Sequence, residues 1–429
     1  MRLNADTCKE EFPEASAAIK EKTYKDDYYD SLDTPQEAGI RAVQVREIHA
    51  RAGFEMRNWV SNIPKVPGML GEEGAKKSLQ NATDKQMSER VLGMTWEPTE
   101  DVLLFSIDLH ESLIDYIQGN RRPTKRATLR CIMSFFDPLG LLSPYLIHGK
   151  IIMQDLWRAG TDWDEEIGDD LFSKWCEWTK LLSKLNCVKV PRCYFGHVRP
   201  EDLSDLQLHV FTDASEQAYE CAAYLRSVAE GKMRCTLVMA RSKVASLKAM
   251  SIPRMELQPA VLGSRLMDSV CTNHSLKITK RNLWTDSSTV LSWIRSDHRK
   301  FKTYVAHRIG KILSLTQPGQ WNWIASQKNI ADCLTKWCKE TEPTSDGRWF
   351  GGPDFLYIPE ECRPTKDTGL SRAEEELRPR FVLHHTTCAM PGGIIDVTRF
   401  SKWETLLRTV ALVASDLSPT ANYDSRGYQ

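Results

Sequence analysis

The sequence predicts an α/β domain with a mixed sheet flanked by helices, within a chain that is α+β as a whole. Three apolar stretches at 207–213, 219–226 and 234–241 follow one another across short turns, which predicts three successive strands. A helical stretch and a strand that ends at Asp286 come next. Helices then alternate with a further strand, and this order of elements predicts one sheet covered by helices.

The later elements of this block each have a local signal. A helix is predicted from Pro253 to about Val270, because proline favours the first helical turn and Ser251 can cap it. The remaining predictions are a helix over 287–295, a helix over about 301–315, a short strand over 321–324 and a last helix containing Asp332.

The first 110 residues show a mixed pattern. Residues 1–23 have little periodicity and are expected to be frayed. Apolar residues at helical spacing predict a helix after Pro35, and the alternation over 54–60 predicts a strand. The stretches 91–96 and 102–107 predict a hairpin that turns at Glu97 and Pro98.

Residues 111–200 are predicted to be mostly helical. Turns are expected at 137–140 and at Ser143 and Pro144. Four tryptophans of this region are expected in the core or at an interface: Trp157, Trp163, Trp175 and Trp178.

The composition limits the function classes. With 57 basic and 57 acidic residues the net charge is zero, so any nucleic-acid surface must be a local patch. No apolar run approaches the roughly 20 residues that span a bilayer. The polar N-terminus and the 12 cysteines favour an intracellular protein, cytoplasmic or nuclear, with reduced thiols. Zinc at Cys187 and Cys193, or at 384–388, would lack a second ligand pair, so ordinary thiols are favoured.

Four short stretches each contribute one carboxylate in a setting that suits metal-dependent phosphodiester hydrolysis. Asp213 and Asp286 end apolar strands, and Glu256 and Asp332 lie in helical segments. Such hydrolysis uses hard oxygen ligands to hold two Mg²⁺ ions about 3.5–4 Å apart, one of which activates water. Any one of these acids alone could simply cap an element end, but the four together predict a common site.

The motifs around these acids are "FTDAS", "SIPRMELQPAVLGSRL", "WTDSSTVLSWIRSD", "RKFKTYVAHRIGKI" and "NIADCLTK". With them the chain resembles the ribonuclease H domain of BEL/Pao LTR-retrotransposon polyproteins, the Pao retrotransposon peptidase family. The resemblance implies an RNase H-like domain at 205–340 that cleaves RNA in an RNA–DNA hybrid. Asp213, Glu256, Asp286 and Asp332 would be catalytic ligands of two Mg²⁺ ions, with Mn²⁺ as a possible substitute.

The flanking segments resemble other parts of such a polyprotein. Tyr24, Lys25, Asp26 and Asp27 are similar to the tyrosine–X–aspartate–aspartate turn of reverse transcriptases. The resemblance implies a truncated palm and primer-grip remnant at 24–110, a thumb and connection region at 111–204 and a pre-integrase tail at 341–429. A polymerase needs a third aspartate and fingers, so Asp26 and Asp27 are expected to be vestigial.

Three departures from the family pattern bear on activity. Pro259 follows Glu256 by three positions and removes a helical hydrogen bond, at a cost of about 3 kcal/mol in a straight helix. Glu220 stands where the family commonly has glycine, and the loop 326–329 has no histidine. These changes fit a decayed copy of the element.

Two other functions are weighed against the nuclease. The triplet Asp367, Thr368 and Gly369 suggests an aspartic peptidase, but it follows a polar loop rather than an apolar strand. A catalytically inactive nucleic-acid-binding remnant is the stronger alternative. Its candidate phosphate contacts are Arg295, Arg299, Lys300, Lys302 and Arg308, interleaved with Trp293, Phe301 and Tyr304. The same stretch could be only a solvated helix face. The expected partners are an RNA–DNA hybrid and other polyprotein products, and no membrane.

Overall fold

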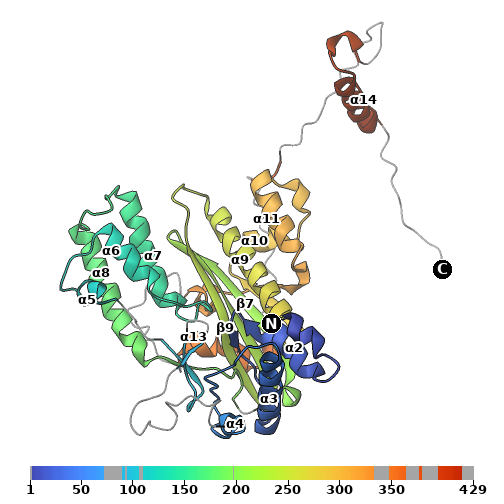
Figure 1. Cartoon of the computed structure of the whole chain (residues 1–429). Helices are drawn as coiled ribbons and strands as arrows, with labels where there is room; N and C mark the ends of the chain where they lie inside the picture. Colours follow the sequence, from blue (N-terminus) through green and yellow to red (C-terminus); the bar gives the residue numbers. More distant parts are fainter. Residues whose placement is uncertain are drawn as a thin grey trace. The chain divides into compact units, whose positions relative to one another are not determined.

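The computed structural model describes residues 2–71, 89–91, 94–105, 110–196, 198–332, 347–363, 376–378 and 395–417 (Figure 1). The chain divides into two units, 1–378 and 379–429. The described part of the second unit contains one α-helix, α14 (Trp403–Leu417). Among the described residues, no helix is both long enough and apolar enough to cross a bilayer.

The centre of the first unit is a five-stranded mixed sheet in the order β11-β10-β7-β8-β9. Three long strands, β7 (Ser204–Ala214), β8 (Ala218–Ala229) and β9 (Lys232–Val244), run antiparallel to one another. The shorter β10 (Lys280–Thr285) lies parallel to both β7 and β11 (Trp321–Trp323). The predicted mixed sheet is therefore confirmed.

One face of the sheet is covered by α9 (Ile252–Asn273), with α10 (Ser288–Ile294) and α11 (Thr303–Leu313) beside it. Leu208 and Val210 of β7 share a buried cluster with Leu257 and Ala260 of α9. The helix approaches the strand closely at Gly263, where a Cβ atom would lie 2.5 Å from Thr212 Cγ2. Only glycine fits this contact without displacement of a neighbour.

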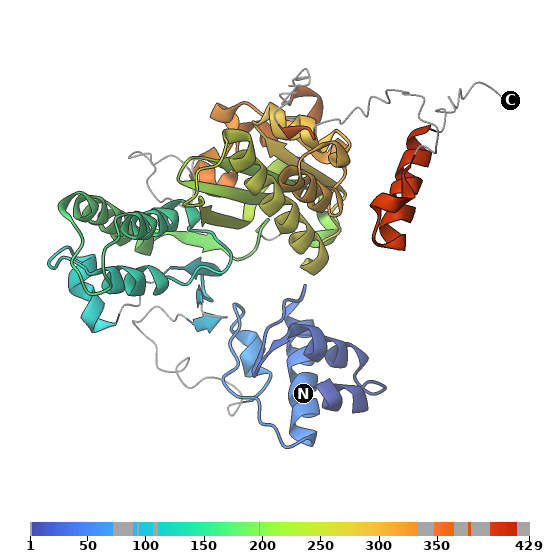
Figure 2. The same cartoon turned by 90° about the horizontal axis from the view of Figure 1, so that it is seen from above.

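The other face packs against a helical region that precedes the sheet in sequence. It comprises α5 (Glu111–Ile117), α6 (Lys125–Met133), α7 (Ser143–Arg158) and α8 (Asp169–Leu182), drawn in teal to green in Figure 2. Phe211 and Tyr224 of the sheet share one buried cluster with Trp175 and Trp178 of α8. Because successive strand residues point to opposite faces, β7 contributes to both clusters.

One turn prediction for this region was wrong and the other is confirmed. Ser143 and Pro144 do not form a turn; they begin α7, where proline suits the first helical positions. The turn at 137–140 is confirmed, and Asp137 accepts hydrogen bonds there from Leu141 N at 2.9 Å and Leu142 N at 2.7 Å.

The four tryptophans of this region divide into two pairs. Trp175 and Trp178 are buried in the core, as expected. Trp157 and Trp163 lie outside the core, with 51% and 39% exposure, and contact each other edge to face.

The N-terminal residues form a small helical cluster. Residues 1–23, expected to be frayed, contain α1 (Arg2–Thr7) and α2 (Pro13–Lys22), which pack on α3 (Pro35–Arg51) through buried apolar residues. The predicted helix α3 is confirmed, and Thr34 and Glu37 close a capping box at its start. Residues 54–60 form no named strand, and the short helix α4 (Lys65–Gly68) follows them.

The described part of the first unit also contains two small antiparallel sheets. The hairpin of β1 (Thr23–Tyr24) and β2 (Asp27–Tyr28) follows α2. The second sheet joins β3 (Glu89–Val91), β4 (Met94–Glu97), β5 (Val102–Leu104) and β6 (Lys189–Pro191). The pairing of β4 with β5 confirms the predicted hairpin, although residues 106 and 107 lie outside the described residues.

Candidate carboxylate site

Two of the four predicted acids lie at the carboxyl ends of neighbouring parallel strands. Thr212 of β7 and Thr285 of β10 are partners in the parallel register. Asp213 follows Thr212, and Asp286 follows Thr285 directly after β10 ends. Both acids therefore belong to the same edge of the sheet.

Glu256 reaches this edge from the beginning of α9. Its carboxylate accepts a hydrogen bond from Ser287 Oγ, and Ser287 is the residue next to Asp286. Burial raises the pKa of Glu256 above its usual value, the Ser287 hydrogen bond lowers it, and the negative charge of Asp286 raises it further. The charge of Asp286 thus acts on Glu256.

The segment that carries Asp332 is tied to both strand ends. Ser326 Oγ donates to Asp286 Oδ2 at 2.5 Å, and Asn329 Nδ2 donates to the Thr212 carbonyl at 3.1 Å. Asp332 N in turn donates to the Asn329 carbonyl at 3.1 Å. These bonds bring the fourth acid-bearing segment to the edge that holds the other three.

The segments that carry the four acids converge at this edge, but their carboxylates are not arranged as a metal-ligand set. Among the described residues, no group of three or more His, Cys, Asp or Glu side chains is placed to hold a single metal ion. Mg²⁺ commonly binds through one or two protein carboxylates, and water and substrate phosphates complete its coordination. The oxygen donors at this edge have the chemistry that such an ion prefers.

A fifth carboxylate, Glu220, lies beside Asp213. The two residues are direct partners in the antiparallel register of β7 and β8. Glu220 is completely buried, and neither of its carboxylate oxygens has a hydrogen-bond partner in the described structure. Burial and the charge of Asp213 raise the pKa of Glu220 well above its usual value. Unpartnered buried oxygens of this kind are compatible with cation binding.

Pro259 does not interrupt α9. The helix continues from Ile252 to Asn273 with Pro259 inside it, and the proline ring is buried. The ring therefore contributes to packing at a position where the helix loses one backbone hydrogen bond.

The predicted basic stretch is only partly available to a ligand. Arg295, Arg299 and Lys300 are exposed at the surface, whereas Trp293 and Phe301 are buried in the core with 1% and 4% exposure. Those two aromatic rings cannot stack on bases, which corrects the expectation of interleaved aromatics. The Arg308 guanidinium lies 3.5 Å from the centroid of the Tyr304 ring, so one face of that ring is covered as well.

Residues 376–378 lie along the same stretch. Lys302 N donates to the Glu376 carbonyl at 2.7 Å, and Arg378 N donates to the Lys300 carbonyl at 2.8 Å. The Glu376 carboxylate also accepts two hydrogen bonds from Arg254, at 2.6 and 3.0 Å. Part of the predicted nucleic-acid surface is therefore occupied by this segment.

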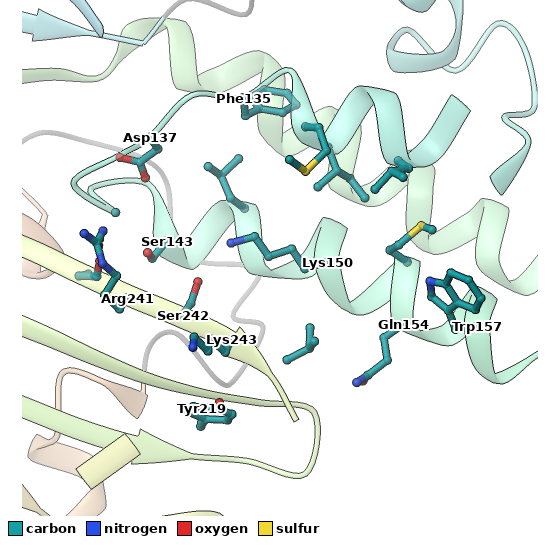
Figure 3. Close-up of a pocket in the computed structure, with 18 of the residues that line it drawn as sticks. Phe135, Asp137, Ser143, Lys150, Gln154, Trp157, Tyr219, Arg241, Ser242 and Lys243 are labelled. Carbon is teal, nitrogen blue, oxygen red and sulfur yellow. Dashed lines mark hydrogen bonds between the residues drawn. The ribbon is translucent and has the colours of Figure 1, made fainter. Parts of the chain in front are cut away.

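A cavity of about 760 Å³ lies between α6, α7 and the β8–β9 edge of the sheet, and none of the four predicted acids lines it (Figure 3). Lys150 extends into it from α7, and Arg241 and Lys243 contribute from β9. Among the described residues that line it, Asp137 is the one acidic side chain, and its carboxylate accepts hydrogen bonds from backbone N–H groups. The cavity is thus basic and apolar, unlike the carboxylate edge.

The remaining predicted residues lie elsewhere or outside the described part. Asp26 and Asp27 belong to the β1–β2 hairpin, where Lys25 adopts φ 55° and Tyr29 Oη donates to Asp27 Oδ2 at 2.9 Å. Most of the helix predicted around Asp332 falls on residues outside the described part, as do the peptidase triplet 367–369 and residues 384–388. Cys187 and Cys193 are exposed free thiols.

Comparison with known proteins assigns the central part of the chain. Residues 124–287 match the family model described as the Pao retrotransposon-like RNaseH-like domain. This span is a Pao retrotransposon RNaseH-like domain, and the mixed sheet packed against helices is consistent with an RNase H-like fold. The match includes α6–α8 and three of the four acids, and it ends before Asp332. No curated protein matches the chain.

The prediction from sequence missed three polar side chains that position the acids. Ser287 could have been recognised, because it is the N-cap of α10 and accepts from Val290 N at 3.2 Å. Ser326 and Asn329 carry no comparable local signal. Their hydrogen bonds depend on how the segment after β11 returns to the sheet.

Proposed function

We propose that the domain hydrolyses the RNA strand of RNA–DNA hybrids at the edge formed by Asp213, Glu256, Asp286 and Asp332, with Mg²⁺ or Mn²⁺ as cofactor. The observation that carries this proposal is the convergence of four acid-bearing segments at the carboxyl ends of β7 and β10. The Pao retrotransposon RNaseH-like domain at 124–287 supports the nucleic-acid substrate.

The chain's own residues would hold and orient the oxygen donors. Asp213 and Asp286 would supply ligands from adjacent strand ends, with Glu256 and Asp332 on either side. Ser287 and Ser326 would orient the carboxylates of Glu256 and Asp286 through their hydroxyl groups. A bound divalent cation supplies Lewis-acid activation of water and stabilises the leaving oxygen, which gives 3′-hydroxyl and 5′-phosphate ends.

Binding of nucleic acid without cleavage is the second candidate. The specific observation in its favour is Glu220, a buried carboxyl directly opposite Asp213 that is not among the four acids of the proposed ligand set. The side chains of Arg295, Arg299 and Lys300 could still contact phosphates if the acids were inactive. Such binding would weaken steeply with salt in either case.

The flanking regions are proposed to derive from the same polyprotein. Residues 24–110 would be a palm remnant with vestigial Asp26 and Asp27, and 341–429 a pre-integrase segment. The thumb and connection region expected at 111–204 overlaps the matched RNaseH-like domain from residue 124 onward, so only 111–123 would lie outside that domain. We expect no DNA synthesis at this hairpin, because the ammonium group of Lys25 would compete with Mg²⁺ for the two aspartates.

The test is cleavage of a labelled RNA–DNA hybrid by the purified chain, with Mg²⁺ or with EDTA. Asp213→Asn should abolish Mg²⁺-dependent cleavage, whereas Asp268→Asn, at an exposed position of α9, should leave it unchanged. Cleavage by the Asp213→Asn protein at the wild-type rate would refute the proposed site. Binding that persists without any cleavage by the wild type would favour the second candidate.

A further inference from the structure

Asp213 and Glu220 form a carboxyl pair within the sheet. They are directly opposite in the antiparallel register, so their side chains project from the same face. Directly opposed residues have Cβ atoms about 4.5–5.5 Å apart, which is within reach of a shared ligand. Their exposed fractions are 6% for Asp213 and 0% for Glu220.

The carboxyl group of Glu220 has no hydrogen-bond partner where one would be expected. Both of its oxygens are buried and accept no hydrogen bond within the described structure. Buried polar groups are normally paired, and a buried carboxylate is strongly unfavourable unless a charge compensates it. A group in this state beside a second carboxylate points to a missing positive charge.

The described protein groups do not supply that charge by direct contact. The positive charge of Lys150 on α7 lowers the pKa of Glu220, but among the described residues Lys150 forms no hydrogen bond with the Glu220 carboxyl group. Ser242 of β9, the other register partner of Glu220, is uncharged.

We propose that Glu220 is an additional ligand, beside Asp213, for a divalent cation at the carboxyl end of β7. The inference rests on the proposed function, because Asp213 is a cation ligand in both. It changes the ligand set from four carboxylates to five, and it assigns a role to a buried carboxyl group whose oxygens have no hydrogen-bond partner. A hard cation with oxygen ligands suits two opposed carboxylates, and water would complete its coordination.

The experiment is Mn²⁺ titration of the full chain by calorimetry without nucleic acid, together with thermal unfolding in Mn²⁺ and in EDTA. Glu220→Gln keeps the side-chain shape and removes the charge. We expect this variant to lose about ten-fold or more in Mn²⁺ affinity, as is typical when support at a metal site is removed. In EDTA, the midpoint temperature of unfolding of Glu220→Gln should be higher than that of the wild type. The increase in this temperature on addition of Mn²⁺ should be smaller than in the wild type.

Glu216→Gln is the matched control, because Glu216 is exposed in the same β7–β8 connection. It should bind Mn²⁺ as the wild type does. Should Glu220→Gln not fold, Glu220→Ala gives the same comparison. Equal Mn²⁺ affinity in the Glu216 and Glu220 variants would overturn the proposal. So would a loss of stability in EDTA shared by Glu220→Gln and Lys150→Met, because Lys150 would then be the partner.

The outcomes separate this inference from the proposed function. Mn²⁺ binding that depends on Glu220, in a chain that leaves the hybrid intact, supports the inference and refutes the nuclease. Cleavage that depends on Asp213, with Mn²⁺ affinity unaffected by Glu220→Gln, supports the nuclease and refutes the inference.

Discussion

The Ser287 hydroxyl donates a hydrogen bond to the carboxylate of Glu256 and thereby joins the start of α9 to the end of β10. The same oxygen accepts from Val290 N at 3.2 Å as the N-cap of α10. The Ser287 side chain therefore caps α10 directly after β10 and also orients the carboxylate of Glu256, which belongs to α9.

Ser287→Ala should destabilise the protein through both hydrogen bonds. Loss of an N-cap costs about 1 kcal/mol, and loss of the donor to the half-buried carboxylate of Glu256 adds to it. Urea unfolding at neutral pH would measure the change in the free energy of unfolding. Ser288→Ala, one residue later in the first turn of α10, is the control and should have a smaller effect.

The pKa of Glu256 predicts a pH-dependent effect on stability. Because the folded-state pKa is raised above the usual value of 4.5, the folded protein holds this proton to higher pH than the unfolded chain. The contribution of the protonated Glu256 carboxyl to the free energy of unfolding is complete below the unfolded-state pKa. It is lost as pH rises through the folded-state pKa.

Glu256→Gln removes this titration. In EDTA, the variant should therefore gain stability relative to wild type as pH rises from about 4 to 8. The measurement is the free energy of unfolding of both proteins across that range. A difference that stays constant with pH would contradict the raised pKa.

Gly263→Ala should destabilise the packing of α9 on β7. The added Cβ would lie 2.5 Å from Thr212 Cγ2, next to Asp213, so the helix or the strand must move. Overpacking of this kind typically costs about 1–3 kcal/mol, which outweighs the gain in helix propensity. Gly319→Ala is the control, because a Cβ there meets no atom within 4 Å. Thermal unfolding of both variants provides the comparison.

Pro259→Ala should stabilise the chain. Alanine would restore the backbone hydrogen bond to the Met255 carbonyl within a helix that is already continuous. The propensity difference of about 3 kcal/mol is offset in part by loss of the buried ring, so we expect a net gain of about 1–2 kcal/mol. Chemical denaturation tests this, and a clear loss of stability would show that packing of the ring dominates.

Arg299 and Lys300 are expected to bind phosphates of a hybrid. Replacement of both by alanine should weaken hybrid binding and reduce the slope of log affinity against log salt by about 1 for each phosphate that is no longer neutralised. Fluorescence anisotropy at several salt concentrations, in the Asp213→Asn background, separates binding from cleavage. A pair of control substitutions, Lys232→Ala and Arg234→Ala near the β8–β9 turn, should leave the slope unchanged.

Much of the fold follows from local sequence signals. The strands β7, β8, β9 and β10 and the helices α3 and α9 were predicted close to their observed bounds, because apolar periodicity and proline at helix starts are local properties. The prediction failed for 54–60, where apolar and polar residues alternate but no regular β-strand forms. It failed at Ser143 and Pro144 because proline also begins helices.

The candidate site divides in the same way. The positions of Asp213 and Asp286 at strand ends were evident from the apolar runs before them. That Trp293 and Phe301 are buried could not be known, because helical periodicity alone does not say which neighbour covers a face.

The elements, their order and the four acid-bearing motifs could be predicted from the amino-acid sequence, since they depend on neighbours within a few residues. The position of Glu220 opposite Asp213, and the hydrogen bonds of Ser326 and Asn329 at the ends of β10 and β7, became visible only in the folded chain. Strand register and the return of a distant segment are set by the packing of the whole core, and a shift of one residue would turn Glu220 to the other face.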